Sequence, residues 1–146
     1  MTTKQYLGQI SRLDRMIKNK LSEISELKEL SRSISAVKNT ERVQTTPNFD
    51  KIGTAQAKID EMERNIDKLV DEYVDKRDLI IKQIDEIEDE TYYNILFARY
   101  IEKKTFEKIS TEINYSFRNT TRLHGKALNE FERKYGNLYL KNDMLS

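Results

Sequence analysis

Apolar residues recur at every seventh position, in two interleaved sets, along residues 1–37. Seven of the nine positions in this frame are apolar or aromatic: Tyr6, Ile10, Leu13, Ile17, Ile24, Leu27 and Ile34. Lys20 and Ser31 are the exceptions. A seven-residue repeat averages about 3.5 residues per turn, close to the roughly 3.6 of an α-helix, so these side chains form one stripe that needs a partner helix. With Thr2 and Gln5 as a capping box, the segment is predicted to form one long amphipathic helix.

A second stripe with the same period follows a break in the pattern. One set of its core positions is Ile52, Ile59, Ile66, Tyr73, Ile80 and Ile87. The other set is Ala55, Met62, Leu69, Lys76 and Gln83, and Ile84 can take over the stripe beside Gln83. Residues 38–50 lose the repeat and contain the only proline, which is typical of a linker. The second helix is predicted to begin at Pro47 with Thr46 as its N-cap, or a little later with Asp50 as its cap.

The two predicted helices carry opposite charge. Residues 1–37 contain seven basic and four acidic residues, whereas residues 51–88 contain seven basic and eleven acidic ones. Opposite charge favours pairing between them. Each helix would be on the order of 50 Å long, and thirteen linker residues reach at most roughly 45 Å, so parallel pairing within one chain is disfavoured. Residues 1–88 are therefore predicted to form an antiparallel coiled-coil hairpin, either a dimerisation surface or only a spacer.

From residue 89 the repeat gives way to three shorter helical segments. The first has an apolar face made of Tyr93, Leu96, Phe97, Tyr100 and Ile101, which should pack over the other two. Thr105 can cap the second helix, whose Phe106, Ile109 and Ile113 point inward. Asn114 and Tyr115 form the turn, and Ser116 caps the third helix. This arrangement is typical of a helix-turn-helix, whose second helix enters the DNA major groove. The predicted fold is all-α, with the hairpin at 1–88, this domain at 89–135 and a short tail at 136–146.

The third helix of this domain has an apolar side and a basic side. Thr120, Leu123, Ala127 and Phe131 fall on one side, with His124 and Leu128 at its edge. The opposite side carries Arg118, Arg122, Gly125 and Asn129, flanked by Asn119, Thr121 and Lys126. Since arginine bonds bidentately to guanine and asparagine to adenine, Arg118, Asn119 and Arg122 are the expected base readers. Phosphate contacts are expected from Lys103, Lys104, Lys108 and Lys126.

Composition argues against catalysis. The chain has no cysteine and a single histidine, His124, which leaves no thiolate nucleophile and no ordinary zinc site. Acidic pairs lie on long amphipathic helices, and neither a glycine-rich phosphate loop nor a Ser/His/Asp set accompanies them. No enzyme activity, catalytic residue, metal or cofactor is therefore expected, and His124 is expected to be packed or to contact phosphate. No stretch approaches the roughly 20 apolar residues of a membrane span, and the start lacks a signal peptide.

Residues 99–132, RYIEKKTFEKISTEINYSFRNTTRLHGKALNEFE, resemble the region 4 helix-turn-helix of bacterial sigma-70-type factors. The shared pattern is a helix ending in Arg-Tyr, a threonine-capped helix, a small turn, a serine-capped recognition helix and a final Ala-Leu. Within that group the sequence is most similar to the sigma-like late transcription regulators of phages and prophages of Gram-positive bacteria, the RinA- and ArpU-like proteins. Residues 6–27 and 41–46 resemble the N-terminal half of related phage proteins.

The resemblance implies an activator that binds a phage promoter, often of late packaging and structural genes, and helps host RNA polymerase in the bacterial cytoplasm. On the matching positions, Ser116 would cap the recognition helix, and Arg118, Asn119 and Arg122 would read DNA. Two departures stand out. Thr120 occupies a position where such helices place a larger aliphatic residue. Nothing corresponds to the sigma region that contacts the −10 element, which favours activation of an existing holoenzyme over replacement of its sigma factor.

Three functions remain open at this level. The first is a transcription regulator that binds double-stranded DNA as a homo-oligomer, with the hairpin dimerising or contacting polymerase. The second is a small terminase-like DNA-packaging subunit, for which a ring oligomer would be the sign. The third is a structural coiled-coil adaptor that binds only protein, for which absence of salt-dependent DNA binding would be the sign.

Overall fold

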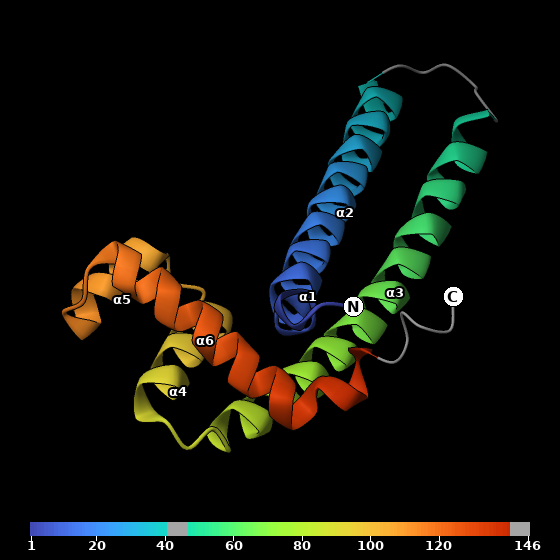
Figure 1. The fold of residues 1–146 in the computed structure, drawn as a ribbon. Coiled ribbons are helices and arrows are strands. Elements are labelled where there is room, and N and C mark those ends of the chain that lie inside the picture. Colours follow the sequence, from blue (N-terminus) through green and yellow to red (C-terminus); the bar gives the residue numbers. More distant parts are fainter. Residues whose placement is uncertain (41–46, 141–146) are drawn as a thin grey trace. The chain divides into compact units, whose positions relative to one another are not determined.

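The computed structural model describes residues 1–40 and 47–140, with side chains for residues 1–33 and 53–140. The elements in chain order are α1 Thr3–Leu7, α2 Gln9–Thr40, α3 Pro47–Asp85, α4 Glu90–Leu96, the π-helix η1 Phe97–Ile101, α5 Phe106–Ile113, α6 Phe117–Tyr135 and the 3-10 helix η2 Gly136–Leu138 (Figure 1). Among these described helices, none has the length and apolar character that crossing a bilayer requires.

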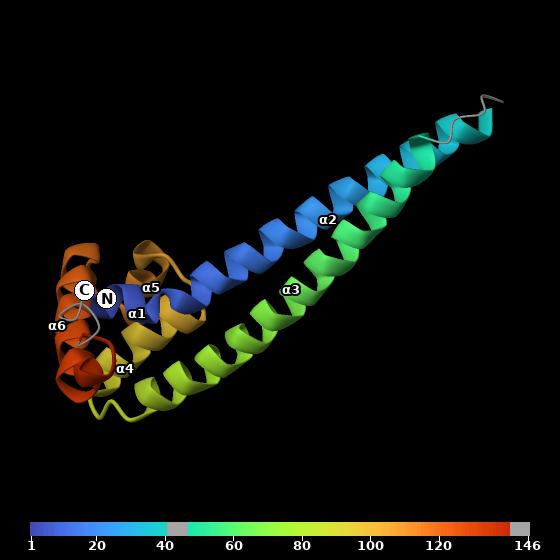
Figure 2. The ribbon, with the colours of Figure 1, turned by 90° about the vertical axis from the view of Figure 1, so that its right-hand side faces the viewer.

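The long helices α2 and α3 form an antiparallel hairpin, as predicted (Figure 2). Both reach into the segment expected to be linker, because α2 runs to Thr40 and α3 begins at Pro47. Only the apolar stripe of a helix needs a partner. The backbone hydrogen bonds continue past the last apolar residue, so each helix is longer than its stripe. Pro47 occupies the first helical position, where a missing N–H costs nothing. Thr46, the predicted N-cap, lies outside the described residues.

The predicted core stripe of the hairpin is confirmed where side chains are described. Ile24 of α2 is buried together with Ile59 and Ile66 of α3, and Ile17, Leu27 and Met62 pack against them. A cross-helix ion pair joins Lys28 Nζ and Glu63 Oε1 at 3.3 Å, with both side chains about half exposed. Such an exposed pair adds only about 0–1 kcal/mol. The apolar stripe, rather than the ion pair, therefore holds the helices together.

Contacts divide the chain at different places from the predicted boundaries. One compact unit is Leu13–Glu72, the greater part of the hairpin. The other combines Met1–Arg12 with the described residues from Tyr73 onward. The second unit thus takes α1, the first residues of α2 and the last part of α3 into the same body as the C-terminal helices.

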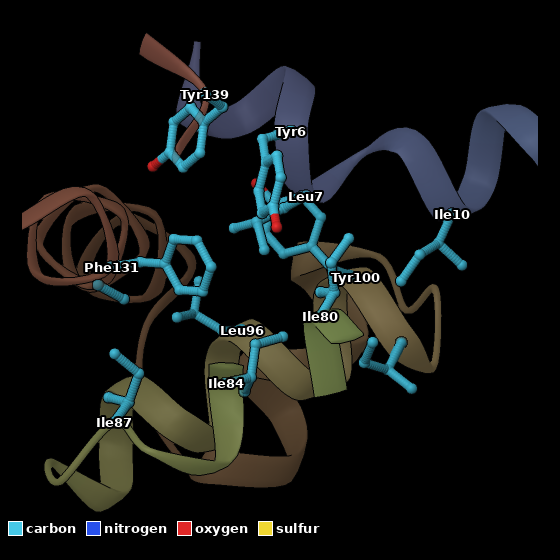
Figure 3. Close-up of a cluster of buried hydrophobic side chains, with 12 residues drawn as sticks. Tyr6, Leu7, Ile10, Ile80, Ile84, Ile87, Leu96, Tyr100, Phe131 and Tyr139 are labelled. Carbon is cyan, nitrogen blue, oxygen red and sulfur yellow. The ribbon is translucent and has the colours of Figure 1, made fainter. Parts of the chain in front are cut away.

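The core of this second unit draws side chains from both ends of the chain (Figure 3). Its fully buried members include Leu7, Ile10, Ile80, Ile84, Leu96, Ala127 and Phe131. Tyr139 stacks on Tyr6 with 4.4 Å between ring centroids, and its hydroxyl lies 2.8 Å from Thr3 Oγ1. Residues 136–140, expected to be tail, therefore belong to the folded unit.

A polar residue occupies one core position of α3. Gln83 is buried, and its Oε1 accepts a hydrogen bond of 2.7 Å from the Tyr6 hydroxyl. The next residue, Ile84, is fully buried, which confirms that it takes over the stripe. Because the buried amide oxygen has a partner, this break in the apolar pattern leaves no uncompensated acceptor.

Candidate nucleic-acid interface

The helix that supports the candidate site is not α-helical throughout. Asp89 caps α4 by accepting a hydrogen bond of 3.0 Å from the backbone N–H of Tyr92, but residues from Phe97 to Ile101 form a π-helix. The buried side chains of α4 and η1 fall into two clusters: Leu96, Tyr100 and Ile101 join the large core, whereas Ile95 and Ala98 pack with Ile109. The regular spacing predicted from the sequence included the first group and missed Ile95 and Ala98. The segment contacts both α5 and α6, as predicted.

Helices α5 and α6, and the turn between them, have the predicted caps. Thr105 Oγ1 accepts from the backbone N–H of Lys108 at 3.2 Å, and Ser116 Oγ accepts from that of Asn119 at 3.1 Å. Asn114 ends α5 in the left-handed conformation, with φ 60° and ψ 37°, which asparagine tolerates better than most residues. These local signals fix where α5 ends and α6 begins (Figure 1).

The apolar side of α6 is the buried side. Thr120, Ala127 and Phe131 are fully buried, and Leu123 and Leu128 are partly buried. Thr120, at the position noted above for its small polar side chain, donates its hydroxyl to the backbone oxygen of Ser116 at 2.9 Å. Its polar atom is therefore satisfied, and the helix keeps a continuous buried side from Thr120 to Phe131.

The opposite side of α6 faces solvent with three cations. Arg118, Arg122 and Lys126 are exposed at successive intervals of four residues, and we call them the basic face. Asn119, at the edge of this face, accepts hydrogen bonds from Arg122 Nε at 3.2 Å and from Arg122 Nη2 at 2.7 Å, both on its Oδ1 atom. Thr121, on the other edge, donates its hydroxyl to the backbone oxygen of Arg118 at 2.9 Å. The predicted base readers thus share one surface.

The predicted phosphate-binding lysines differ in their surroundings. Lys108 on α5 and Lys126 on α6 are exposed. Lys104 lies between two carboxylates, 2.9 Å from Glu112 and 3.2 Å from Glu102, and the hydrogen bond to Glu112 is the main cause of its raised pKa. Lys103 has a left-handed backbone, φ 58°, and its Nζ is 6.0 Å from the centroid of the Tyr73 ring. Lys104 would have to leave its ion pairs to contact phosphate.

Arg99 is a structural residue of this site that the predicted site residues did not include. Its guanidinium carbon lies 4.2 Å from the centroid of the Phe106 ring, and its Nη1 donates to the backbone oxygen of Lys104 at 3.1 Å. It thereby ties the loop before α5 to the first residue of that helix. Helical spacing places Arg99 off the predicted apolar face of the preceding helix, so the pattern offered no signal for this role.

His124 is packed rather than exposed. It is only 6% exposed, its Nε2 lies 2.7 Å from the Tyr100 hydroxyl, and its ring meets Phe106 edge-on at 4.8 Å. Burial, together with the positive charges of Lys4 and Arg99, lowers the pKa of His124 to about 4. Burial also raises the pKa of Tyr100 to about 12. Both side chains are therefore neutral at pH 7, and the pair acts as an uncharged hydrogen bond under α6.

His124 is expected to make the protein less stable as the pH falls from about 6.5 to about 4. In that range the unfolded histidine, with the ordinary pKa of 6.5, binds a proton that the folded one, with a pKa of about 4, does not. Protonation therefore favours unfolding, by about 2–3 kcal/mol at the acid end. Urea unfolding at pH 7, 6, 5 and 4 measures this. A His124→Gln variant should lose less stability across the same range, and equal losses in both proteins would show that His124 is not responsible.

Comparisons with known proteins assign no family to this surface. No family model matches the chain, and the comparisons with curated proteins and with solved structures find no match. What defines the surface is therefore its own geometry: the capped turn after Asn114, the buried side of α6, the basic face and the exposed Lys108 on α5.

Proposed function

We propose that this chain is a sequence-specific regulator of transcription that binds double-stranded DNA with α6 in the major groove. The observation that carries the proposal is the division of α6 into a buried side and the basic face. A major groove about 12 Å wide admits one α-helix, and its guanines offer acceptors that arginine binds bidentately. Arg118 and Arg122 lie within the first two turns of α6, which is the part of a recognition helix that meets base edges.

Exposed lysines on both α5 and α6 also support DNA as the ligand. Lys108, on α5, and Lys126, on α6, are exposed cations on the two helices that flank the turn. In a helix-turn-helix the first helix crosses the phosphate backbone while the second lies in the groove. These lysines therefore provide phosphate contacts, which position the helix without reading sequence.

The finer part of the proposal concerns the biological role. The resemblance of residues 99–132 to sigma region 4 supports an activator of late phage promoters that acts with host RNA polymerase. We propose that the α2–α3 hairpin holds two copies together or contacts the polymerase. A pair of copies would bind half-sites spaced by roughly 10 bp or a multiple of it.

The deciding experiment is in vitro selection of random duplex DNA at a fixed, near-physiological salt concentration. Wild-type protein is compared with the double variant Arg118→Ala, Arg122→Ala and with Arg133→Ala. Arg133 is a matched control because it is an exposed arginine of the same helix, engaged with Glu130 at 2.6 Å. A motif enriched by the wild type and by Arg133→Ala, but lost in the double variant, supports the proposal. The proposal fails if wild type enriches nothing, or if the double variant enriches the same motif.

Replacing Gly125 with alanine is expected to stabilise the free protein and to weaken DNA binding. A Cβ atom at Gly125 would meet nothing within 4 Å, so the higher helix propensity of alanine should add about 1 kcal/mol to the free energy of unfolding. In the complex the added methyl group would stand between α6 and the DNA. Denaturant unfolding and fluorescence anisotropy with the selected duplex measure the two effects.

Gly53→Ala is the matched control for that variant. Gly53 lies within α3, and a Cβ atom there also meets nothing within 4 Å. It should therefore add similar stability and leave DNA binding unchanged. If Gly125→Ala stabilises the protein as Gly53→Ala does and binds DNA as tightly as wild type, α6 does not approach DNA at Gly125.

A further inference from the structure

The amide of Asn119 is already engaged in the free protein. Both hydrogen bonds from Arg122, from Nε at 3.2 Å and from Nη2 at 2.7 Å, end on the same Oδ1 atom. An amide oxygen has two acceptor sites, so this contact uses both of them. What Asn119 still offers to a ligand is its NH₂ group, which only donates.

This state is unsuited to reading adenine. The bidentate contact of asparagine with adenine needs the amide oxygen to accept from N6 and the amide nitrogen to donate to N7. With Oδ1 engaged by Arg122, only the second of these bonds can form. The side chains then offer only hydrogen-bond donors to a ligand, and no acceptor, at Arg118, Asn119 and Arg122.

The same contact leaves Arg122 ready for guanine. A guanidinium has five N–H donors in a rigid planar fork. The edge formed by Nε and Nη2 binds Asn119, which leaves the two N–H groups at the far end, one on Nη1 and one on Nη2. Guanine O6 and N7 are the pair of neighbouring acceptors in the major groove that such an edge matches.

We propose that Asn119 is a positioning residue that holds Arg122 for a guanine, and that the beginning of α6 reads guanines through Arg118 and Arg122 without an adenine read by Asn119. This inference rests on the proposed function and specifies the class of site. Fixing a flexible side chain before binding saves about 0.5–1.5 kcal/mol. Asn119 should therefore contribute roughly 2- to 12-fold to the preference for guanine at the base that Arg122 contacts.

The test measures base preference on the selected duplex, with each base pair replaced in turn, by fluorescence anisotropy. The proteins are wild type, Asn119→Ala, Asn119→Asp, Arg122→Ala and the double variant Asn119→Ala, Arg122→Ala, with Asn129→Ala as the control for another exposed amide of α6. Arg122→Ala should remove the preference for one guanine. Asn119→Ala should weaken that same preference by roughly 2- to 12-fold, and should add nothing once Arg122 is absent.

Asn119→Asp separates positioning from direct reading. Its carboxylate can still hold Arg122 but cannot donate to adenine N7, so the guanine preference should persist even if overall affinity falls. The inference is overturned if wild type prefers adenine at one position and Asn119→Ala abolishes that preference with Arg122 in place or absent. It is also overturned if Asn119→Ala leaves every base preference unchanged.

A measurement on the free protein keeps this inference distinct from the proposed function. The Nε proton of Arg122 should exchange more slowly with water in wild type and in Asn119→Asp than in Asn119→Ala, as observed by ¹⁵N NMR. Equal exchange in all three proteins overturns the positioning role, whatever DNA is bound. If exchange is slowed as expected but wild type enriches no DNA motif, the proposed function fails and the guanine assignment fails with it.

Discussion

Replacing Phe131 with alanine is expected to lower the free energy of unfolding by about 3–5 kcal/mol. The Phe131 ring is fully buried, and its centroid lies 5.1 Å from that of Tyr135, 6.0 Å from that of Tyr6 and 6.5 Å from that of Tyr139. These rings come from both ends of the chain, so the loss of one leaves a cavity that no single element can close. Because whole domains are stable by only about 5–15 kcal/mol, this one change removes a large share.

Urea unfolding followed by tyrosine fluorescence is the appropriate measurement, since Tyr6, Tyr135 and Tyr139 surround the site. Leu138→Ala serves as the control: Leu138 is 63% exposed, so its truncation should change stability by less than about 0.5 kcal/mol. A loss below about 1 kcal/mol in Phe131→Ala would mean that the N-terminal helix does not share a core with α6.

The double variant Arg118→Ala, Arg122→Ala is expected to lose about 2–6 kcal/mol of binding free energy on the duplex selected by the wild type, since each bidentate arginine–guanine contact discriminates by about 1–3 kcal/mol. Its affinity for that site should approach its affinity for a scrambled duplex. Lys108→Ala and Lys126→Ala should behave differently. Each should weaken binding to all duplexes alike and reduce the salt slope by about one, as expected for a lost phosphate contact.

Fluorescence anisotropy with the selected and the scrambled duplex, at several salt concentrations, distinguishes these behaviours. If the double variant weakens binding to both duplexes by the same factor, the arginines contact phosphate rather than bases. In that case the sequence preference arises from other residues of the protein. Arg133→Ala is the control that shows how much binding weakens when any positive charge is removed from α6.

Features that depend on neighbouring residues were predicted well from the sequence. The seven-residue repeats indicated that α2 and α3 pair because a stripe at that spacing is unstable without a partner. The antiparallel orientation followed from a linker too short for parallel pairing. The caps at Thr2, Thr105 and Ser116 followed from side chains that accept a hydrogen bond from the backbone three residues away. The left-handed Asn114 followed from the tolerance of asparagine for that conformation. The buried side of α6 followed from helical periodicity alone.

Features that depend on distant residues were not predicted. Gln83 looked like an imperfection of the repeat, because its partner, the Tyr6 hydroxyl, comes from 77 residues earlier. Tyr139 looked like part of a tail, because its stacking on Tyr6 follows no local period. The contact between Asn119 and Arg122 is local, but choosing it requires the rotamers of both side chains. For that reason the residue types that can read bases were predicted from the sequence, but the hydrogen bonds from Arg122 to Asn119 were not.

The contact between Thr3 and Tyr139 also sets the order of events during synthesis. The two residues are 136 positions apart, so at about 5–20 residues per second a ribosome adds Tyr139 roughly 7–27 s after Thr3. The pairing of Ile24 with Ile59 and Ile66 can begin much earlier in translation. Throughout the delay Tyr6 and Leu7 have neither Phe131 nor Tyr139 to cover them. Until Phe131 and Tyr139 have been made, the apolar side chains of Tyr6 and Leu7 are therefore exposed in the nascent chain and can be bound by a chaperone.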